Sequence, residues 1–294
     1  MFDADQIAVI RDGQVHLLDA TTGTTVTVLP GDGTTRVTTG SIGATSVLLA
    51  VSDTTITVWS SNDPVTWELP AGATVNTLGA GVVIRAADGR VSILTDGGLA
   101  PYASPRDGAA PLAVTTDGAL QWASARGEIL TASPAGTIAA TTVLAPPTEG
   151  AKASRWLSGG PIAVVRWSLP DESTVLATHT TTDGAITGQM SLIGDTSTSL
   201  VRSSDRASAM YGRGLIDLAT GALSVPDETF TASTALGDVY YGATGTTSAI
   251  LRAGVLHPTP AAPTVIPVGV TGNGDLVATV SGVVAVYPNT SAKR

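Results

Sequence analysis

The sequence contains no cysteine among its 294 residues. This absence excludes disulfide bonds, thiolate catalysis, cysteine-ligated zinc and iron–sulfur clusters. Charged residues are also scarce, at 13% of the chain, which is about half of their usual share. Within this small set, 24 Asp and Glu outnumber 15 Lys and Arg and give a net charge of −9. Such a field repels phosphate backbones and anionic lipid headgroups, so we expect no nucleic-acid partner.

Long apolar runs and helical patterns are missing as well. No window holds the roughly 18 uninterrupted apolar residues of a membrane span, and the opening MFDADQIAVI has no basic stretch before an apolar core. We therefore expect no signal peptide and no direct membrane insertion of this segment. No stretch of helical length combines apolar residues at helical spacing with a cap and freedom from Gly and Pro.

What the sequence does contain is a repeat of short apolar bursts between turn residues. Eight units begin near IAVIR (7), VLLAV (47), VVIRA (82), LAVTT (112), IAVVRW (162), SAMYG (208), DVYYG (238) and LVATV (276). Their mean spacing is about 38 residues, which is typical of repeat architectures. Asp-Gly pairs at Asp12-Gly13, Asp88-Gly89 and Asp117-Gly118 predict hairpin turns inside the units, because these residues tolerate positive φ. A third strand usually follows, as in TTVTVLP or VTWELP, and a fourth stretch such as TRVTTGS or TVNTLGA then leads onward.

The repeat predicts an all-β chain that forms one domain over residues 1–294, a single closed β-propeller of seven or eight four-stranded blades. A sandwich with this many strands would expose long sheet edges, whereas radial repetition protects them. The first unit lacks its leading strand and the last, LVATVSGVVAVYP, lacks its closing strand, so the blade number stays open. The Pro-rich stretch TTVLAPPTEGAKASRW, residues 141–156, stretches the spacing and is the expected protruding loop.

Two turns carry a resemblance to a known family. The stretches DATTG, from Asp19 to Gly23, and DLATG, from Asp217 to Gly221, each follow a predicted strand. At such a turn the Asp carboxylate accepts backbone N–H bonds while Gly takes the left-handed conformation. This Asp-x-x-Thr-Gly turn resembles the blade repeat of quinoprotein-like (PQQ-type) propellers. The tryptophan that follows the turn in that family is absent at Val26 and around Ser224, which points to a non-enzymatic branch.

The candidate binding surface combines aromatic and cationic residues. Arg155 and Trp156 in SRW, and Arg166 and Trp167 in VVRW, lie on adjacent predicted strands beside the Pro-rich loop. Trp and Arg dominate binding hot spots because they combine apolar area with directional hydrogen bonds. The alternative is that the two indoles pack between blades while the arginines reach solvent.

The remaining motifs favour structural roles. Ser60 to Trp67 partly fits the Asp-box of sialidase-like propellers, a turn-stabilising motif, but has Asn62 and Pro64 where that motif has Asp and Gly. In GDVYYG, Tyr240 and Tyr241 fit strand alternation, with one ring facing inward and the other outward.

Metal and catalytic signals are weak. The three histidines, His16, His179 and His257, are far apart, and Asp3 with Asp5 or Asn273 with Asp275 fall short of a calcium loop. Nearly all acidic residues sit in turns, whereas glycoside hydrolysis needs two carboxylates across a pocket. We therefore expect no catalytic residues, no metal and no cofactor.

These features predict a non-catalytic interaction or scaffold module with a protein partner. The two lysines against thirteen arginines resemble a high-GC bacterial coding bias, so we expect a monomeric, extracytoplasmic domain of a bacterial envelope protein, secreted or membrane-anchored. A carbohydrate-active or quinone-dependent propeller enzyme is the alternative. It would gather acidic and basic side chains in the central channel.

Overall fold

The computed structural model describes residues 6–19, 22–43, 45–60, 63–192, 199–203, 206–245, 247–258, 267–270, 275–280 and 283–287. In these ranges the backbone forms strands and turns without any helix. It follows that no helix long and apolar enough to cross a membrane occurs in the described part of the chain. The all-β prediction is confirmed.

The strands form eight antiparallel sheets of strands that are consecutive in the chain. The first two sheets contain β1 (Gln6–Arg11), β2 (Gln14–Asp19) and β3 (Thr25–Leu29), then β4 (Arg36–Ile42), β5 (Thr45–Val51), β6 (Thr55–Trp59) and β7 (Val65–Glu68). The third and fourth contain β8 (Thr74–Leu78), β9 (Gly81–Arg85), β10 (Val91–Thr95) and β11 (Gly98–Tyr102), then β12 (Ala110–Val114), β13 (Leu120–Ala123), β14 (Glu128–Ala132) and β15 (Ile138–Val143).

The second half of the chain continues the pattern. The fifth and sixth sheets contain β16 (Lys152–Ser158), β17 (Ile162–Ser168), β18 (Thr174–Thr180) and β19 (Ile186–Ser191), then β20 (Val201–Arg202), β21 (Ser208–Tyr211), β22 (Gly214–Asp217) and β23 (Leu223–Ser224). The last two contain β24 (Phe230–Leu236), β25 (Val239–Thr244), β26 (Thr247–Arg252) and β27 (Val255–Pro258), then β28 (Pro267–Val270), β29 (Leu276–Val280) and β30 (Val283–Tyr287).

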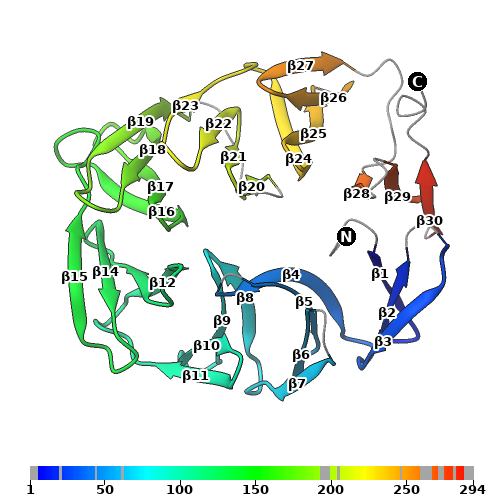
Figure 1. The fold of residues 1–294 in the computed structure, drawn as a ribbon. Coiled ribbons are helices and arrows are strands. Elements are labelled where there is room, and N and C mark those ends of the chain that lie inside the picture. Colours follow the sequence, from blue (N-terminus) through cyan, green and yellow to red (C-terminus); the bar gives the residue numbers. More distant parts are fainter. Residues whose placement is uncertain are drawn as a thin grey trace.

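The eight sheets follow one another around a ring (Figure 1). Strands β4, β8, β12, β16, β20 and β24 lie toward its middle, while β7, β11, β15 and β19 lie on its outer side (Figure 1). The first and last sheets have three described strands each, and the other six have four. The short first and last units are the ones that the sequence predicts.

One detail of the predicted repeat is wrong, namely the unit to which the fourth strand belongs. The stretch TRVTTGS appears in sequence to close the first unit, but β4, which contains most of it, pairs with β5 of the next sheet. The same holds for TVNTLGA, because β8 pairs with β9. Most predicted first strands are therefore second strands of their sheets, and the strand before each of them lines the middle of the ring.

Neighbouring sheets pack face to face, and β5 shows how. Val47, Leu49 and Val51 pack with β9 and β10 of the third sheet, whereas Leu48 and Ala50, on the opposite face, pack with β2 of the first. Because both faces are covered, the strand is a continuous apolar run instead of an alternating one. This arrangement lets a weakly charged chain bury its aliphatic side chains.

The first and last sheets also touch. Ile7 of β1 and Val277 of β29 are buried in one cluster, with Val9 and Val284 against it. No strand pairing joins these two sheets among the residues that the structure describes. The contact between the two ends of the ring is therefore made by side chains.

The two turns that carry the family resemblance have matching geometry. In both, the Gly N–H donates to the Asp carbonyl oxygen at 2.8 Å, and Gly23 and Gly221 have φ of 69° and 75°. The Asp19 carboxylate accepts from the Thr22 amide at 2.7 Å, and that of Asp217 accepts from the Thr220 amide at 3.1 Å. The predicted role of each residue in this turn is confirmed.

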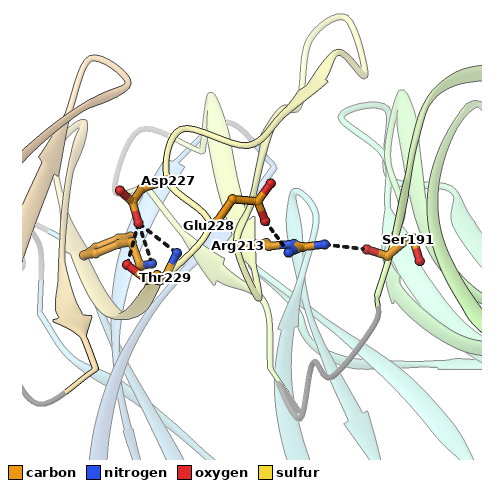
Figure 2. A network of polar contacts seen from close by, with 6 residues as sticks. Ser191, Arg213, Asp227, Glu228 and Thr229 are labelled. Carbon is orange, nitrogen blue, oxygen red and sulfur yellow. Dashed lines mark hydrogen bonds and ion pairs between the residues drawn. The ribbon is translucent and has the colours of Figure 1, made fainter.

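Polar contacts also join neighbouring sheets. Arg213, in the turn between β21 and β22, forms an ion pair with Glu228 and donates to the carbonyl oxygen of Ser191 at 3.5 Å (Figure 2). Asp227, next to Glu228, accepts from the Thr229 amide at 2.8 Å just before β24 begins (Figure 2). The network thereby connects the end of the fifth sheet, the sixth sheet and the entry to the seventh.

Candidate functional site

A cavity of about 1130 Å³ lies where turns from the second to the sixth sheets converge. The β8–β9, β12–β13, β16–β17 and β20–β21 turns contribute to it, together with β4. These turns follow the inner strands of their sheets, so the ring itself brings them together. We call this space the central cavity.

Hydroxyl groups dominate the polar lining of the central cavity. They belong to Thr38, Thr39, Ser41, Ser46, Thr77, Thr115, Thr116, Ser158, Thr181 and Ser203. Arg202 and Arg206 are the only charged side chains among the described lining residues, and no aromatic ring occurs among those residues. The cavity is thus polar and locally cationic in a chain whose net charge is −9.

The β20–β21 turn presents both arginines. Ser203 organises it: its backbone N–H donates to the Ser208 carbonyl oxygen at 3.0 Å, and its Oγ accepts from the Ser208 amide at 3.0 Å. Arg206 has a φ of 59°, an uncommon value for a residue with a side chain. In this conformation Arg206 Nη1 donates to the Gly79 carbonyl oxygen at 2.6 Å, in the third sheet.

Gly79 is held in place from its other side. The Ala80 amide donates to the Val114 carbonyl oxygen at 2.8 Å, and a Cβ added to Gly79 would lie 2.4 Å from that same oxygen. Only glycine fits this close approach. The contact with Arg206 therefore joins a tightly packed turn of the third sheet to a turn of the sixth sheet.

Arg202 is half-buried, and its Nη2 donates to Ser158 Oγ of the fifth sheet at 2.9 Å. Burial lowers the pKa of Arg202, and the positive charge of Arg206 lowers it further. The ion pairs found within the described ranges are Arg90–Asp88, Arg106–Glu128 and Arg213–Glu228, so neither cavity arginine has a carboxylate partner there. Two like charges therefore share the cavity without a described counter-charge.

The four residues predicted as a binding surface lie together on β16 and β17 but differ in exposure. Arg155 is exposed and pairs in register with half-buried Arg166. Trp156 is half-buried against the cluster that contains Trp167, which is only 3% exposed. The Arg155 and Trp156 part of this predicted surface is open to a partner, and its role stays a prediction.

Trp167 packs within the core. Its Nε1–H donates to Nε2 of the buried His179 at 3.2 Å, and its ring lies against Gly127 of the fourth sheet. This is the packing between sheets that the sequence leaves open as the alternative for the indoles.

The other motifs have defined places. Trp67 of the partial Asp-box packs against the core cluster of the second and third sheets, while Asn62 lies outside the described residues. Tyr240 is buried and bonds Ser208 at 2.7 Å, whereas Tyr241 is half-buried. The alternation predicted for this tyrosine pair is present.

Possible metal ligands do not gather in the described part of the chain, where no group of three or more His, Asp or Glu side chains could hold an ion. His16, His179 and His257 lie on β2, β18 and β27. Asp3, Asp5 and Asn273, considered for calcium, lie outside the described residues.

Sequence reasoning missed the two arginines of the central cavity. Arg202 and Arg206 are four positions apart in VRSSDR, a local pair of cations in a chain with few of them. This spacing is the signal that could have marked them. Their neighbours Gly79 and Ser158 are distant in sequence, and only the ring brings them close.

Comparison with solved structures supports the arrangement. BamB from Moraxella catarrhalis matches with a TM-score of 0.52 at 14% identity, over 96% of this chain and 93% of that chain. Saccharomyces cerevisiae Sqt1 matches with a TM-score of 0.51 at 15% identity, over 95% and 91%. The computationally designed Ika8 protein matches with a TM-score of 0.50 at 13% identity, over 98% and 94%.

The fold is a β-propeller. At these identities the likeness concerns the fold alone. No family model matches the chain, and no curated protein matches it either.

Proposed function

We propose that this propeller is a non-catalytic scaffold that binds a protein partner at the mouth of its central cavity. The observation that carries the proposal is the lining of that cavity, which offers many hydroxyl groups and two arginines but no described carboxylate or imidazole. General acid–base chemistry and glycoside hydrolysis depend on such groups. Polar groups on a rigid frame suit recognition instead.

The closure of the ring and its number of blades are part of the same proposal. We infer a single closed ring of eight blades over residues 1–294, in which Ile7 and Val277 join the first blade to the last. The matching turns at Asp19 and Asp217 support a relationship to the non-enzymatic quinoprotein-like propellers. Because blade faces are buried against each other, the cavity mouth and the loops are the surfaces left for a partner.

The cellular setting is proposed from composition. The arginine-rich, lysine-poor usage supports a bacterial source, and the Thr-rich, weakly charged chain suits a monomeric extracytoplasmic domain of an envelope protein. The net charge of −9 argues against nucleic acid as the partner.

Site-specific photo-cross-linking tests the scaffold function. A photoreactive phenylalanine analogue replaces Thr116 at the cavity mouth or, as the matched control, Thr141 on the outer strand β15; both positions are exposed. In an envelope extract of the source organism we expect a discrete adduct at Thr116 and none at Thr141. The absence of an adduct at Thr116 would contradict the proposal.

The predicted surface on β16 is tested in the same extract. Arg155→Ala changes an exposed side chain, and Trp156→Phe keeps an aromatic ring against the core cluster, whereas Trp167 is too buried for a variant to report on binding alone. If Arg155 and Trp156 contribute to the interface, each variant reduces the adduct. Unchanged adduct yield in both variants would remove this surface from the proposal.

A further inference from the structure

Two arginine charges in the central cavity, for which the described residues provide no carboxylate partner, indicate the kind of ligand it takes. With the described part of the protein, Arg202 and Arg206 each form one hydrogen bond, to Ser158 Oγ and to the Gly79 carbonyl oxygen. A guanidinium carries several further N–H donors and cannot lose its charge by deprotonation. Both side chains therefore keep donor capacity for an anion.

The two charges also oppose each other. Burial lowers the pKa of Arg202, and the positive charge of Arg206 lowers it further. An anion placed between them relieves the mutual repulsion and gains charge-assisted hydrogen bonds. Planar guanidinium groups match carboxylate oxygens especially well, since they bind them in a bidentate manner.

The remaining lining fits a peptide better than a sugar or a nucleotide. Strands β4, β16 and β20 stand at the ends of their sheets, so one edge of each has no strand partner among the described residues and leaves backbone N–H and C=O groups for a ligand. An extended peptide uses such groups and nearby hydroxyls. Sugars and bases favour stacking on aromatic rings, and the described lining residues provide none.

We propose that Arg202 and Arg206 bind the carboxylate of an acidic residue in an extended segment of the protein partner. This inference rests on the scaffold function and names the chemistry of the segment that enters the central cavity. The volume of about 1130 Å³ exceeds the range of roughly 300–1,000 Å³ typical of small-ligand pockets, which suits a stretch of peptide.

The test is an NMR titration of the full chain, following the Nε–Hε signals of its arginines. The probe is acetyl-Ala-Glu-Ala-amide, its neutral counterpart is acetyl-Ala-Gln-Ala-amide, and inorganic phosphate forms a third arm. We expect saturable shifts at Arg202 and Arg206 with the Glu peptide, with a Kd on the order of 1 mM, and none with the Gln peptide. No saturable shift with the Glu peptide, or equally tight binding of phosphate, would overturn the assignment.

Variants locate the site. Arg206→Gln changes an exposed side chain and is expected to weaken Glu-peptide binding about tenfold or more. Arg90→Gln is the matched control, since Arg90 is exposed and lies in the β9–β10 turn away from the cavity, and it should leave the affinity unchanged. Equal affinity for the Arg206→Gln protein and the wild type would refute the role of Arg206. Because Arg202 is half-buried, Arg202→Gln and the charge-conserving Arg202→Lys are first compared by thermal melting. If the two variants melt at the same temperature, weaker Glu-peptide binding by Arg202→Gln reports the loss of the charge.

Photo-cross-linking at Thr116 separates the two proposals. If the adduct forms and is unchanged by Arg206→Gln, the scaffold function stands and the carboxylate site is wrong. If no adduct forms while the Glu peptide still binds at Arg206, the cross-linking result contradicts the scaffold function, and the NMR result still supports a carboxylate site at Arg206. A reduced adduct in Arg206→Gln, with no reduction in Arg90→Gln, supports both.

Discussion

Acidification is expected to destabilise the protein through one buried side chain, His179 on β18. Its Nε2 accepts the Trp167 Nε1–H at 3.2 Å, and its Nδ1 lies 3.3 Å from the Gly184 carbonyl oxygen. These two contacts require a neutral ring with its proton on Nδ1. Burial lowers the pKa of His179 below its ordinary value of 6.5, and the hydrogen bond to Gly184 opposes this only in part.

The direction of the effect follows from proton linkage. The unfolded chain protonates His179 more readily than the folded chain does, so its contribution to stability is complete above pH 6.5 and decreases as the pH falls toward the lower folded-state pKa. Protonation of Nε2 leaves the Trp167 N–H facing another donor. An unsatisfied buried donor costs about 1–3 kcal/mol, which sets the expected loss of unfolding free energy. Turn carboxylates such as Asp217, whose pKa lies below 3.8, act only at lower pH.

Urea unfolding at about pH 7.5 and about pH 5 measures this loss, since His is the side chain that ordinarily titrates in that window. His179→Gln removes the titration while its amide can accept from Trp167 and donate to Gly184. We expect its stability to change little between the two pH values, whereas the exposed-site control His257→Gln should behave like the wild type. If His179→Gln loses as much unfolding free energy between the two pH values as the wild type does, the reasoning is refuted.

Three further predictions concern the core and the turns, and urea unfolding tests each of them. Leu49→Ala empties a fully buried site between the second and third sheets and should cost about 2–5 kcal/mol; a loss below about 1 kcal/mol would contradict this packing. Asp217→Ala removes the acceptor for two amides of an exposed turn and should cost on the order of 1 kcal/mol of unfolding free energy. An unchanged stability would show that these hydrogen bonds do not stabilise the protein. Trp167→Phe should cost at least about 1 kcal/mol more than Trp122→Phe, because the buried Nε1 of Trp122 has no described partner. Equal losses would refute the contrast.

Local signals account for what the sequence predicts of the fold. Apolar bursts mark strands, and turn chemistry at Asp19 and Asp217 marks the links between them, because both depend on residues close together in the chain. The point at which one unit ends and the next begins does not depend on residues close together in the chain. A strand such as β4 can close one unit or open the next, and only its pairing with β5 decides.

On β16, part of the predicted surface, regular alternation does not predict which face of the sheet a side chain takes. The pairing of β16 with β17 shifts register between Ala153 and Arg155, and again between Trp156 and Ser158. Each irregularity changes which face the following side chains take, since one extra residue reverses the alternation of a strand. Both extra residues lie on β16, so the face that Trp156 takes does not follow from the sequence, whereas Trp167 of β17 keeps the alternation with Ala163 and Val165 and is buried with them.

The central cavity has no sequence motif because its parts come from strands and turns of five different sheets. Arg206 reaches Gly79 only because the ring places the sixth sheet opposite the third, and neither residue lies in a recognisable pattern with the other. The propeller thus separates two tasks. Sheet faces carry the apolar residues that hold the ring together, whereas the turns at its middle can carry charged side chains such as Arg202 and Arg206, which the packed faces could not tolerate.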